Sequence, residues 1–131
     1  MLAVVMYRNP HTTTRLATVL NELQSAATVA FTEAGPIPPS LNHSLEFLDF
    51  ERQAVFQQEW ICIGREDEIP GHGDYLTHDI AGVPVLVVRQ LDLEIKAFVN
   101  ACAHRFACLV PAAKGSHKRF TCRYHAWTYD S

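Results

Sequence analysis

Two stretches of sequence decide the fold of this chain: Asn100-Ala-Cys-Ala-His-Arg105 and Phe120-Thr-Cys-Arg-Tyr-His-Ala-Trp-Thr-Tyr-Asp130. One residue separates Cys102 from His104, two separate Cys122 from His125, and seventeen lie between the two pairs. Each pair offers one thiolate and one imidazole, and both groups are common metal ligands. Because two short loops at strand ends can bring the pairs together, the spacing predicts one metal centre held by all four side chains.

The interleaving of Cys and His indicates which metal is bound. In a Rieske-type 2Fe–2S cluster two Cys hold one iron and two His hold the other. A structural zinc site also takes two Cys and two His, but its two Cys usually stand close together in the sequence, as do its two His. The spacing therefore favours the 2Fe–2S cluster, and a zinc-stabilised binding module remains the alternative.

The predicted ligand set sets the charge of the cluster. Two ferric ions, two sulfides, two thiolates and two neutral imidazoles give a neutral oxidised site and a reduced site of charge −1. An all-thiolate cluster is two units more negative and accepts an electron less readily. Mixed ligation therefore raises the reduction potential to roughly −150 to +300 mV, against about −400 mV for plant-type ferredoxins.

The sequence around these loops predicts helices first and strands afterwards. Apolar residues at three- and four-residue spacing predict helices over residues 12–34 and 44–59, with a Pro-rich linker at 35–40 between them. From residue 60 the pattern favours strands, over residues 60–64, 75–80, 83–89, 94–100, 119–122 and 127–129. The predicted fold class is mainly β (α+β overall). Residues 1–58 form a helical N-terminal extension, and residues 59–131 form an antiparallel β domain.

Composition and charge limit the function classes. The 131 residues are 48% hydrophobic and 19% charged, as in an ordinary globular domain. Residues 1–100 carry six Lys and Arg against thirteen Asp and Glu, a net −7, whereas residues 101–131 carry a net +4. No apolar run approaches the ~20 residues of a membrane span, and a signal peptide is not indicated. We therefore expect a cytoplasmic protein with neither a membrane nor a nucleic-acid partner, in a compartment that keeps its four Cys reduced.

The two loops resemble the cluster loops of Rieske-type ring-hydroxylating oxygenases. Upstream, three segments resemble the lead-in of the large (alpha) subunits of that family: Phe56-Gln-Gln-Glu-Trp60, Gly64-Arg-Glu-Asp-Glu-Ile-Pro70 and Gly73-Asp-Tyr75. The resemblance covers about residues 45–131. It implies a helical lead-in followed by an antiparallel β Rieske domain with the cluster at its tip.

The resemblance also implies an oxidoreductase function. The cluster of such a subunit receives electrons from a reductase or ferredoxin and passes them to a mononuclear Fe(II) in a separate C-terminal domain. The family works as homo-oligomers or alpha–beta hetero-oligomers and as mono- or dioxygenases, in aromatic hydrocarbon catabolism among other roles. Since this chain stops at Ser131, we expect a truncated piece that lacks the oxygen-activating iron and holds no catalytic residue. A stand-alone Rieske ferredoxin-type electron carrier is the alternative.

Three positions depart from the family pattern. The family usually has Gly where this chain has Phe106 and Ala126, and it has Gly in the hairpin at residues 90–93. Gly at such positions permits positive φ, which strains a bulky residue. The chain also lacks the loop disulfide and the Ser hydroxyl of respiratory-chain Rieske proteins, so we expect a potential near about −150 mV.

Other side chains were weighed for a role at the centre. For Trp127 the sequence favours core packing, and for Cys62 and Cys108 it favours inert thiols, with Cys62 buried in a strand. Arg105 and Arg123 either stabilise the reduced cluster, dock an acidic donor or are simply solvated. The remaining His residues show no ligand spacing and are expected on the surface; they are His11, His43, His72, His78 and His117.

Overall fold

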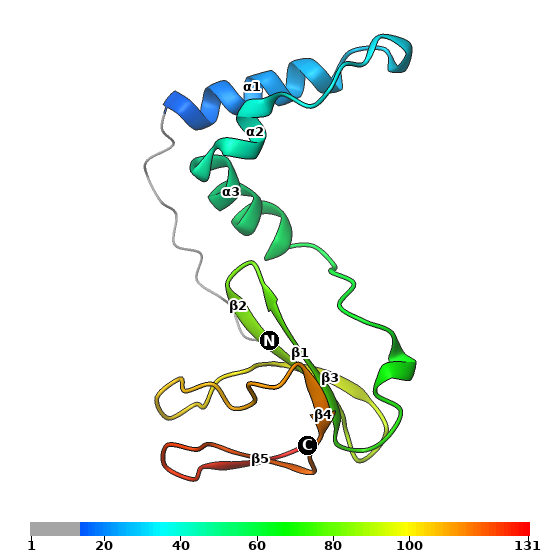
Figure 1. Cartoon of the computed structure of the whole chain (residues 1–131), viewed down its shortest axis with the longest axis vertical. Coiled ribbons are helices and arrows are strands. Elements are labelled where there is room, and N and C mark those ends of the chain that lie inside the picture. Colours follow the sequence, from blue (N-terminus) through cyan, green and yellow to red (C-terminus); the bar gives the residue numbers. More distant parts are fainter. Residues whose placement is uncertain (1–13) are drawn as a thin grey trace. The chain divides into compact units, whose positions relative to one another are not determined.

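The structure is a computed structural model that describes residues 14–131 (Figure 1). By the clustering of its Cα atoms the chain divides into two units, residues 1–58 and 59–131. Each unit is described by itself below. The predicted fold class is confirmed, because the helices precede a set of antiparallel strands.

The first unit consists of short helices. They are α1 (Thr14–Ala27), η1 (Phe31–Glu33), α2 (Pro39–His43), α3 (Leu45–Glu51) and the π-helical turn η2 (Arg52–Phe56). Val19 of α1 and Phe47 of α3 are the buried apolar side chains of this unit among the residues described. The Ser44 hydroxyl accepts the N–H of Phe47 at 3.1 Å and so caps the start of α3.

The predicted helix over residues 12–34 is too long at its C-terminal end, and its start lies outside the described residues. The helix ends at Ala27 because Thr28 leaves the helical pattern. The Thr28 hydroxyl and the Thr28 N–H both donate to the carbonyl of Ser25, at 2.9 and 3.4 Å. Such local bonds compete with continued helix.

The predicted linker at residues 35–40 is also too long. Pro39 and Ser40 belong to α2, since a proline is tolerated at the first position of a helix, where its missing N–H has no intrahelical partner. The predicted helix over 44–59 is found as α3 followed directly by η2, and it ends at Phe56.

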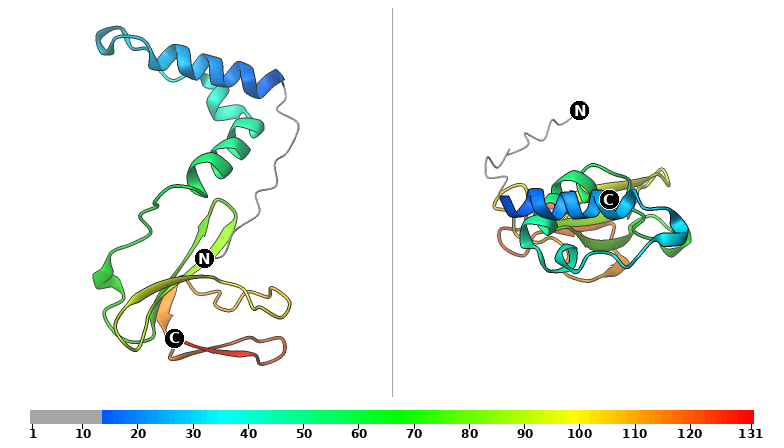
Figure 2. Two further views of the ribbon diagram at one scale, coloured as in Figure 1. Left: turned by 180° about the vertical axis from the view of Figure 1, so that it is seen from behind. Right: turned by 90° about the horizontal axis from the view of Figure 1, so that it is seen from above.

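The second unit holds two antiparallel sheets (Figures 1 and 2). Strands β1 (Asp74–Ile80), β2 (Val83–Arg89), β3 (Ile95–Val99) and β4 (Lys114–Ser116) lie in the order β3-β2-β1-β4. Strands β5 (Arg119–Thr121) and β6 (Thr128–Asp130) form a two-stranded ribbon. One core cluster contains Tyr75, Leu86, Val88, Val110 and Phe120, and a second contains Ile69, Leu76 and Val87. The first cluster joins the ribbon to the larger sheet.

The hairpin between β1 and β2 confirms the predicted turn. Ala81 and Gly82 have φ of 53° and 88°, and Ile80 pairs with Val83. Two successive left-handed residues are the geometry of a two-residue turn whose twist matches the flanking strands.

The predicted strand over residues 60–64 is wrong for this structure. None of the described strands pairs with it, and a strand needs a neighbour to bond its N–H and C=O groups. The expected burial of Cys62 is wrong as well, because its side chain and that of Trp60 are exposed.

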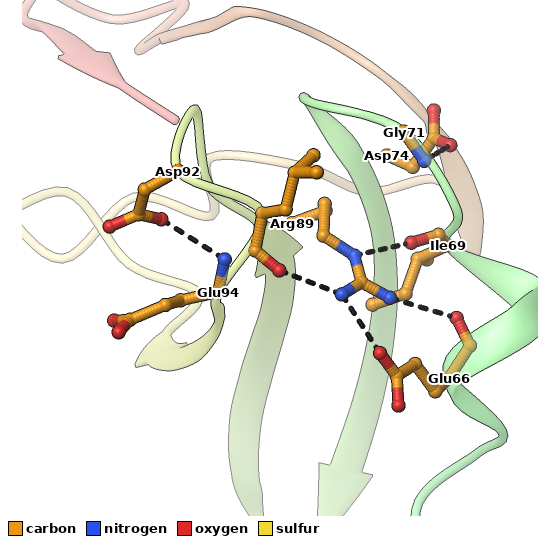
Figure 3. Close-up of polar contacts among 8 residues, drawn as sticks. Glu66, Ile69, Gly71, Asp74, Arg89, Asp92 and Glu94 are labelled. Carbon is orange, nitrogen blue, oxygen red and sulfur yellow. Dashed lines mark hydrogen bonds and ion pairs between the residues drawn. The ribbon is translucent and has the colours of Figure 1, made fainter.

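A buried guanidinium joins the segment that precedes β1 to the larger sheet (Figure 3). Arg89 of β2 donates from Nε to the carbonyl of Ile69 at 2.8 Å and from Nη1 to the carbonyl of Leu93 at 2.7 Å. It also reaches Glu66 of η3 (Glu66–Glu68), from Nη1 to the carboxylate at 3.0 Å and from Nη2 to the carbonyl at 3.2 Å. One side chain thus fixes η3, the end of β2 and the β2–β3 hairpin.

A tight corner precedes β1. The carboxylate of Asp74 accepts the N–H of Gly71 at 2.8 Å (Figure 3). This bond and then the Ser116 hydroxyl hold the pKa of Asp74 below its ordinary value. Burial opposes them, and the charge of Arg89 adds a smaller lowering. Gly73 has φ of 86°, and a Cβ there would lie 2.8 Å from the carbonyl oxygen of His117, so only glycine fits this corner.

Candidate metal centre

The first predicted ligand loop is closed by two backbone bonds. The N–H of Cys102 donates to the carbonyl of Ala107 at 2.8 Å, and the N–H of Phe106 donates to the carbonyl of Cys102 at 2.7 Å. Phe106, the fourth residue after Cys102, has φ of 55°. This left-handed residue turns the chain back on itself, and residues 103–105 within the turn are exposed.

The second loop repeats this pattern. The N–H of Cys122 donates to the carbonyl of Trp127 at 2.8 Å, and the N–H of Ala126 donates to the carbonyl of Cys122 at 2.9 Å. Ala126 is again the fourth residue after the Cys, and its φ is 58°. The two loops therefore share one backbone design, although the His stands second after Cys102 and third after Cys122.

The positions where the family has Gly are left-handed in this structure. Phe106 and Ala126 have φ near that of an αL residue, and Leu93 in the β2–β3 hairpin has φ of 67°. The conformation expected from the resemblance is thus present at each position, with a side chain in place of glycine. An L-residue there costs about 1–2 kcal/mol.

Asn100 closes the base of the first loop. Its buried side chain donates from Nδ2 to the carbonyl of Val110 at 2.6 Å and accepts the N–H of Val110 at 2.9 Å. These two bonds join residues 100 and 110, the two ends of the loop, as hydrogen bonds join two residues of neighbouring strands. This role of Asn100 cannot be predicted from the sequence, because nothing in the sequence marks residue 110 as its partner.

The structure brings the four predicted ligands to the same end of the β unit. The loops that carry them project side by side (Figures 1 and 2). The Cys102 and Cys122 side chains are buried, at 2% and 3% exposure, whereas His104 and His125 are exposed. The two imidazole rings lie 4.8 Å apart between centroids, at an angle of 61°. The sulfur donors are thus buried within the β unit, and the nitrogen donors are exposed at its surface.

Tyr129 of β6 is aimed at the first sulfur. Its hydroxyl lies 3.2 Å from Cys102 Sγ and accepts the N–H of Ala103 at 3.0 Å. The hydrogen bond from Tyr129 lowers the pKa of the Cys102 thiol, helped by the N–H of His104 and the Cys122 side chain, while burial opposes this. The same contact raises the pKa of Tyr129. These groups favour the thiolate, which is the form that binds iron.

Aromatic rings flank both imidazoles. Trp127 stacks on His104 at 5.1 Å with only 9° between the planes, and Tyr124 lies 4.1 Å from the ring of His125. The expectation that Trp127 packs in the core is wrong, because 49% of its surface is exposed. The ring of Trp127 contacts the predicted ligand His104 rather than the hydrophobic core.

The chemistry of this donor set suits a binuclear cluster. Two thiols and two imidazoles approach from opposite loops as pairs of like donors, which is how a 2Fe–2S cluster of mixed ligation is held. The residues present fit a cluster with two ligands on each iron, and the assignment of these four as ligands stays a prediction.

Comparison with known proteins agrees with this chemistry. Residues 59–131 match the model of the Rieske [2Fe-2S] domain. The chain belongs to the Rieske [2Fe-2S] domain family. The chain is similar to the benzene 1,2-dioxygenase alpha subunit of Pseudomonas putida, with 40% identity over 98 residues, or 75% of this chain and 22% of the relative. It is 42% identical over 86 residues to the anthranilate 1,2-dioxygenase large subunit of Acinetobacter baylyi, or 66% of this chain and 18% of the relative.

Solved structures show the same fold. The Rhodococcus sp. naphthalene 1,2-dioxygenase bound to indole superposes on 87% of this chain and 25% of its own, with a TM-score of 0.73 and 31% identity. A quaternary ammonium Rieske monooxygenase gives a TM-score of 0.67 with 32% identity over 71% of this chain and 27% of its own. The predicted resemblance to oxygenase alpha subunits is confirmed, and with it the 2Fe–2S cluster as cofactor. The chain spans about a fifth of the length of the curated relatives it matches.

One further observation concerns membrane-spanning helices. No helix among the described residues combines the length and the apolar character needed to cross a bilayer.

Proposed function

We propose that this chain transfers electrons through a Rieske 2Fe–2S cluster held by Cys102, His104, Cys122 and His125, as the N-terminal part of a ring-hydroxylating oxygenase large subunit. One observation carries the proposal: two buried thiols and two exposed, adjacent imidazoles meet from two loops of the same backbone design. When bound, the cluster supplies a one-electron redox couple.

The chain's own residues have distinct tasks in this proposal. Cys102 and Cys122, which are buried, would hold one iron. His104 and His125, which are exposed, would hold the other, so the imidazole edges would be the exposed ends of the electron path. Tyr129 donates a hydrogen bond to the first sulfur and stabilises its negative charge. Asn100 and the paired backbone bonds keep both loops in shape.

The relatives suggest the partners. Their names identify them as alpha or large subunits of dioxygenases. We propose that a reductase or ferredoxin supplies the electrons in the cytoplasm, and that a mononuclear iron outside this chain receives them in an oligomer of alpha or alpha and beta subunits. We also propose that residues 1–58 act as a helical extension and residues 59–131 as the electron-transfer domain.

Electron paramagnetic resonance of the dithionite-reduced chain tests the proposal, together with analysis for iron and acid-labile sulfide. We expect a Rieske-type signal and two irons per chain. Cys102→Ala and Cys122→Ala should abolish the signal, whereas Cys108→Ala, which removes an exposed thiol near the first loop, should keep it. Bound zinc with no signal would overturn the proposal in favour of a zinc-stabilised binding module.

A further inference from the structure

Strand β3 is an open edge of the larger sheet. In the order β3-β2-β1-β4 it has β2 on one side and no described strand on the other. All five residues of β3, Ile95–Val99, are exposed, and four of them are apolar. The opposite edge, β4, has only three residues, and one of them is Lys114. A short, charged edge resists pairing with another strand, whereas a longer apolar edge favours it.

The ends of the β2–β3 ladder show which residues of β3 bond to β2. At one end the N–H of Gln90 donates to the carbonyl of Glu94 at 2.8 Å. At the other end the N–H of Asn100 donates to the carbonyl of Pro84, also at 2.8 Å. Hydrogen-bonded and non-bonded pairs alternate along an antiparallel ladder. The even-numbered residues of β3 therefore bond to β2.

The odd-numbered residues of β3 direct their backbone groups away from β2. They are Ile95, Ala97 and Val99. The carbonyl of Val99 accepts the N–H of Ala101 at 2.7 Å. The other outward groups have no neighbouring strand within residues 14–131, so they can bond to a strand from outside the chain.

A second copy of β3 fits this edge. When Ala97 lies opposite Ala97 of an antiparallel copy, Ile95 lies opposite Val99, so each outward-facing residue meets another. The same register places Lys96 opposite Phe98, where an ammonium group can lie against an aromatic ring. A parallel copy in register would instead place Lys96 beside Lys96, and like charges directly opposite each other destabilise a sheet.

We infer that β3 pairs antiparallel with β3 of a second copy of this chain, about a two-fold axis at Ala97. The two larger sheets then form one continuous sheet. Because both copies use the same edge, the contact closes on itself and stops at two copies. The inference goes beyond the proposed function and does not depend on the cluster.

Sedimentation of the whole chain over a range of concentrations tests the association. We expect an equilibrium between monomer and dimer, with no larger species. Ala97→Pro removes the central outward N–H of both copies and no bond to β2, and an edge strand tolerates proline at such a position. We expect it to weaken the dimer about tenfold or more. The matched control Ala97→Val keeps the N–H and should leave the dissociation constant within about threefold.

A pair of charge variants tests the register. Phe98→Lys and Phe98→Glu both remove the ring, but only the first places an ammonium group opposite Lys96 of the second copy. We expect the Lys variant to dimerise on the order of tenfold more weakly than the Glu variant, because the dimer holds two such pairs. Equal dissociation constants would contradict the inference. Melting curves check that each variant folds, and these two variants decide the matter where Ala97→Pro does not fold.

Hydrogen exchange of the unaltered chain follows the edge directly. The amides of Ile95, Ala97 and Val99 should exchange more slowly as the protein concentration rises. A chain that stays monomeric, or a dimer that Ala97→Pro and Phe98→Lys leave intact, would overturn the inference. Protection that appears only when a different oxygenase subunit is added would show that the edge binds that subunit, and the inference would be wrong. Loss of the paramagnetic signal contradicts the proposed function and leaves these measurements unaffected.

Discussion

Replacing Tyr129 by Phe should lower the reduction potential of the cluster. The substitution removes one hydroxyl, which lies 3.2 Å from Cys102 Sγ and also accepts the N–H of Ala103. The ring stays and continues to pack against the core cluster of the β unit. The change therefore removes the hydrogen bond to the ligand sulfur, together with the one from Ala103, and keeps the ring.

The size of the shift follows from the strength of that bond. A hydrogen bond to a charged group contributes about 1.5–3 kcal/mol, and one between neutral groups about 0.5–1.5. Reduction adds one negative charge to the cluster, so the bond strengthens by about 1 kcal/mol between the two states. Since a one-electron couple shifts 59 mV for each factor of ten, or about 1.4 kcal/mol, we expect the potential to fall by roughly 40 mV.

The assay is a redox titration followed by the paramagnetic signal. Tyr124→Phe is the matched control, because the Tyr124 ring contacts His125 while its hydroxyl has no hydrogen bond recorded among the described residues. It should leave the potential within about 10 mV. The reasoning is refuted if Tyr129→Phe leaves the potential unchanged or raises it, or if both variants lower it equally.

Three further predictions concern stability. Phe106→Gly should raise the melting temperature by a few degrees. The change relieves about 1–2 kcal/mol of left-handed backbone strain, which exceeds the cost of about 0.5–1 kcal/mol from the greater entropy of glycine in the unfolded chain. A lower melting temperature would contradict this. Arg89→Met should cost about 3 kcal/mol or more in urea unfolding, since it leaves one buried and two partly buried carbonyls without their donor. A loss under about 1 kcal/mol would refute the role given to the guanidinium. The lowered pKa of Asp74 means that its carboxylate stabilises the fold above the ordinary value near 4, and that this is lost as the pH falls through the lower folded value. Asp74→Asn should therefore reduce the loss of unfolding free energy that circular dichroism measures as the pH is lowered. An unchanged dependence on pH would count against this prediction.

The strands that local sequence encodes were predicted, and those that depend on distant partners were not. The hairpin of β1 and β2 follows from two apolar runs around Ala81-Gly82, so its turn and both strands were found. Strand β4 reads Lys-Gly-Ser, which carries no strand signal, and it exists because it pairs with β1. Residues 60–64 show the reverse case, with a good local signal and no described strand beside it.

The same division holds at the candidate metal centre. The four ligands can be predicted because their residue types and spacing are visible in the sequence. Tyr129 and Asn100 were missed because their tasks depend on atoms 27 and 10 residues away. A tyrosine four residues after His125 becomes informative only when the ribbon of β5 and β6 places its hydroxyl beside the first loop.

The backbone, rather than the residue type, sets the shape of the two loops. Each loop closes with a hydrogen bond from the N–H of the fourth residue, Phe106 or Ala126, to the Cys carbonyl. The left-handed φ of that residue then turns the chain, and the carbonyl of the next residue accepts the Cys N–H. The same bonds form in both loops, and both Cys side chains are buried. The two imidazoles lie 4.8 Å apart although the two His residues stand at different positions after their Cys. A loop held by its own backbone bonds and by Asn100 has little freedom to rearrange when the charge of its cluster changes. The strain at Phe106 therefore lowers stability without moving the ligands, and relieving it should leave the reduction potential nearly unchanged.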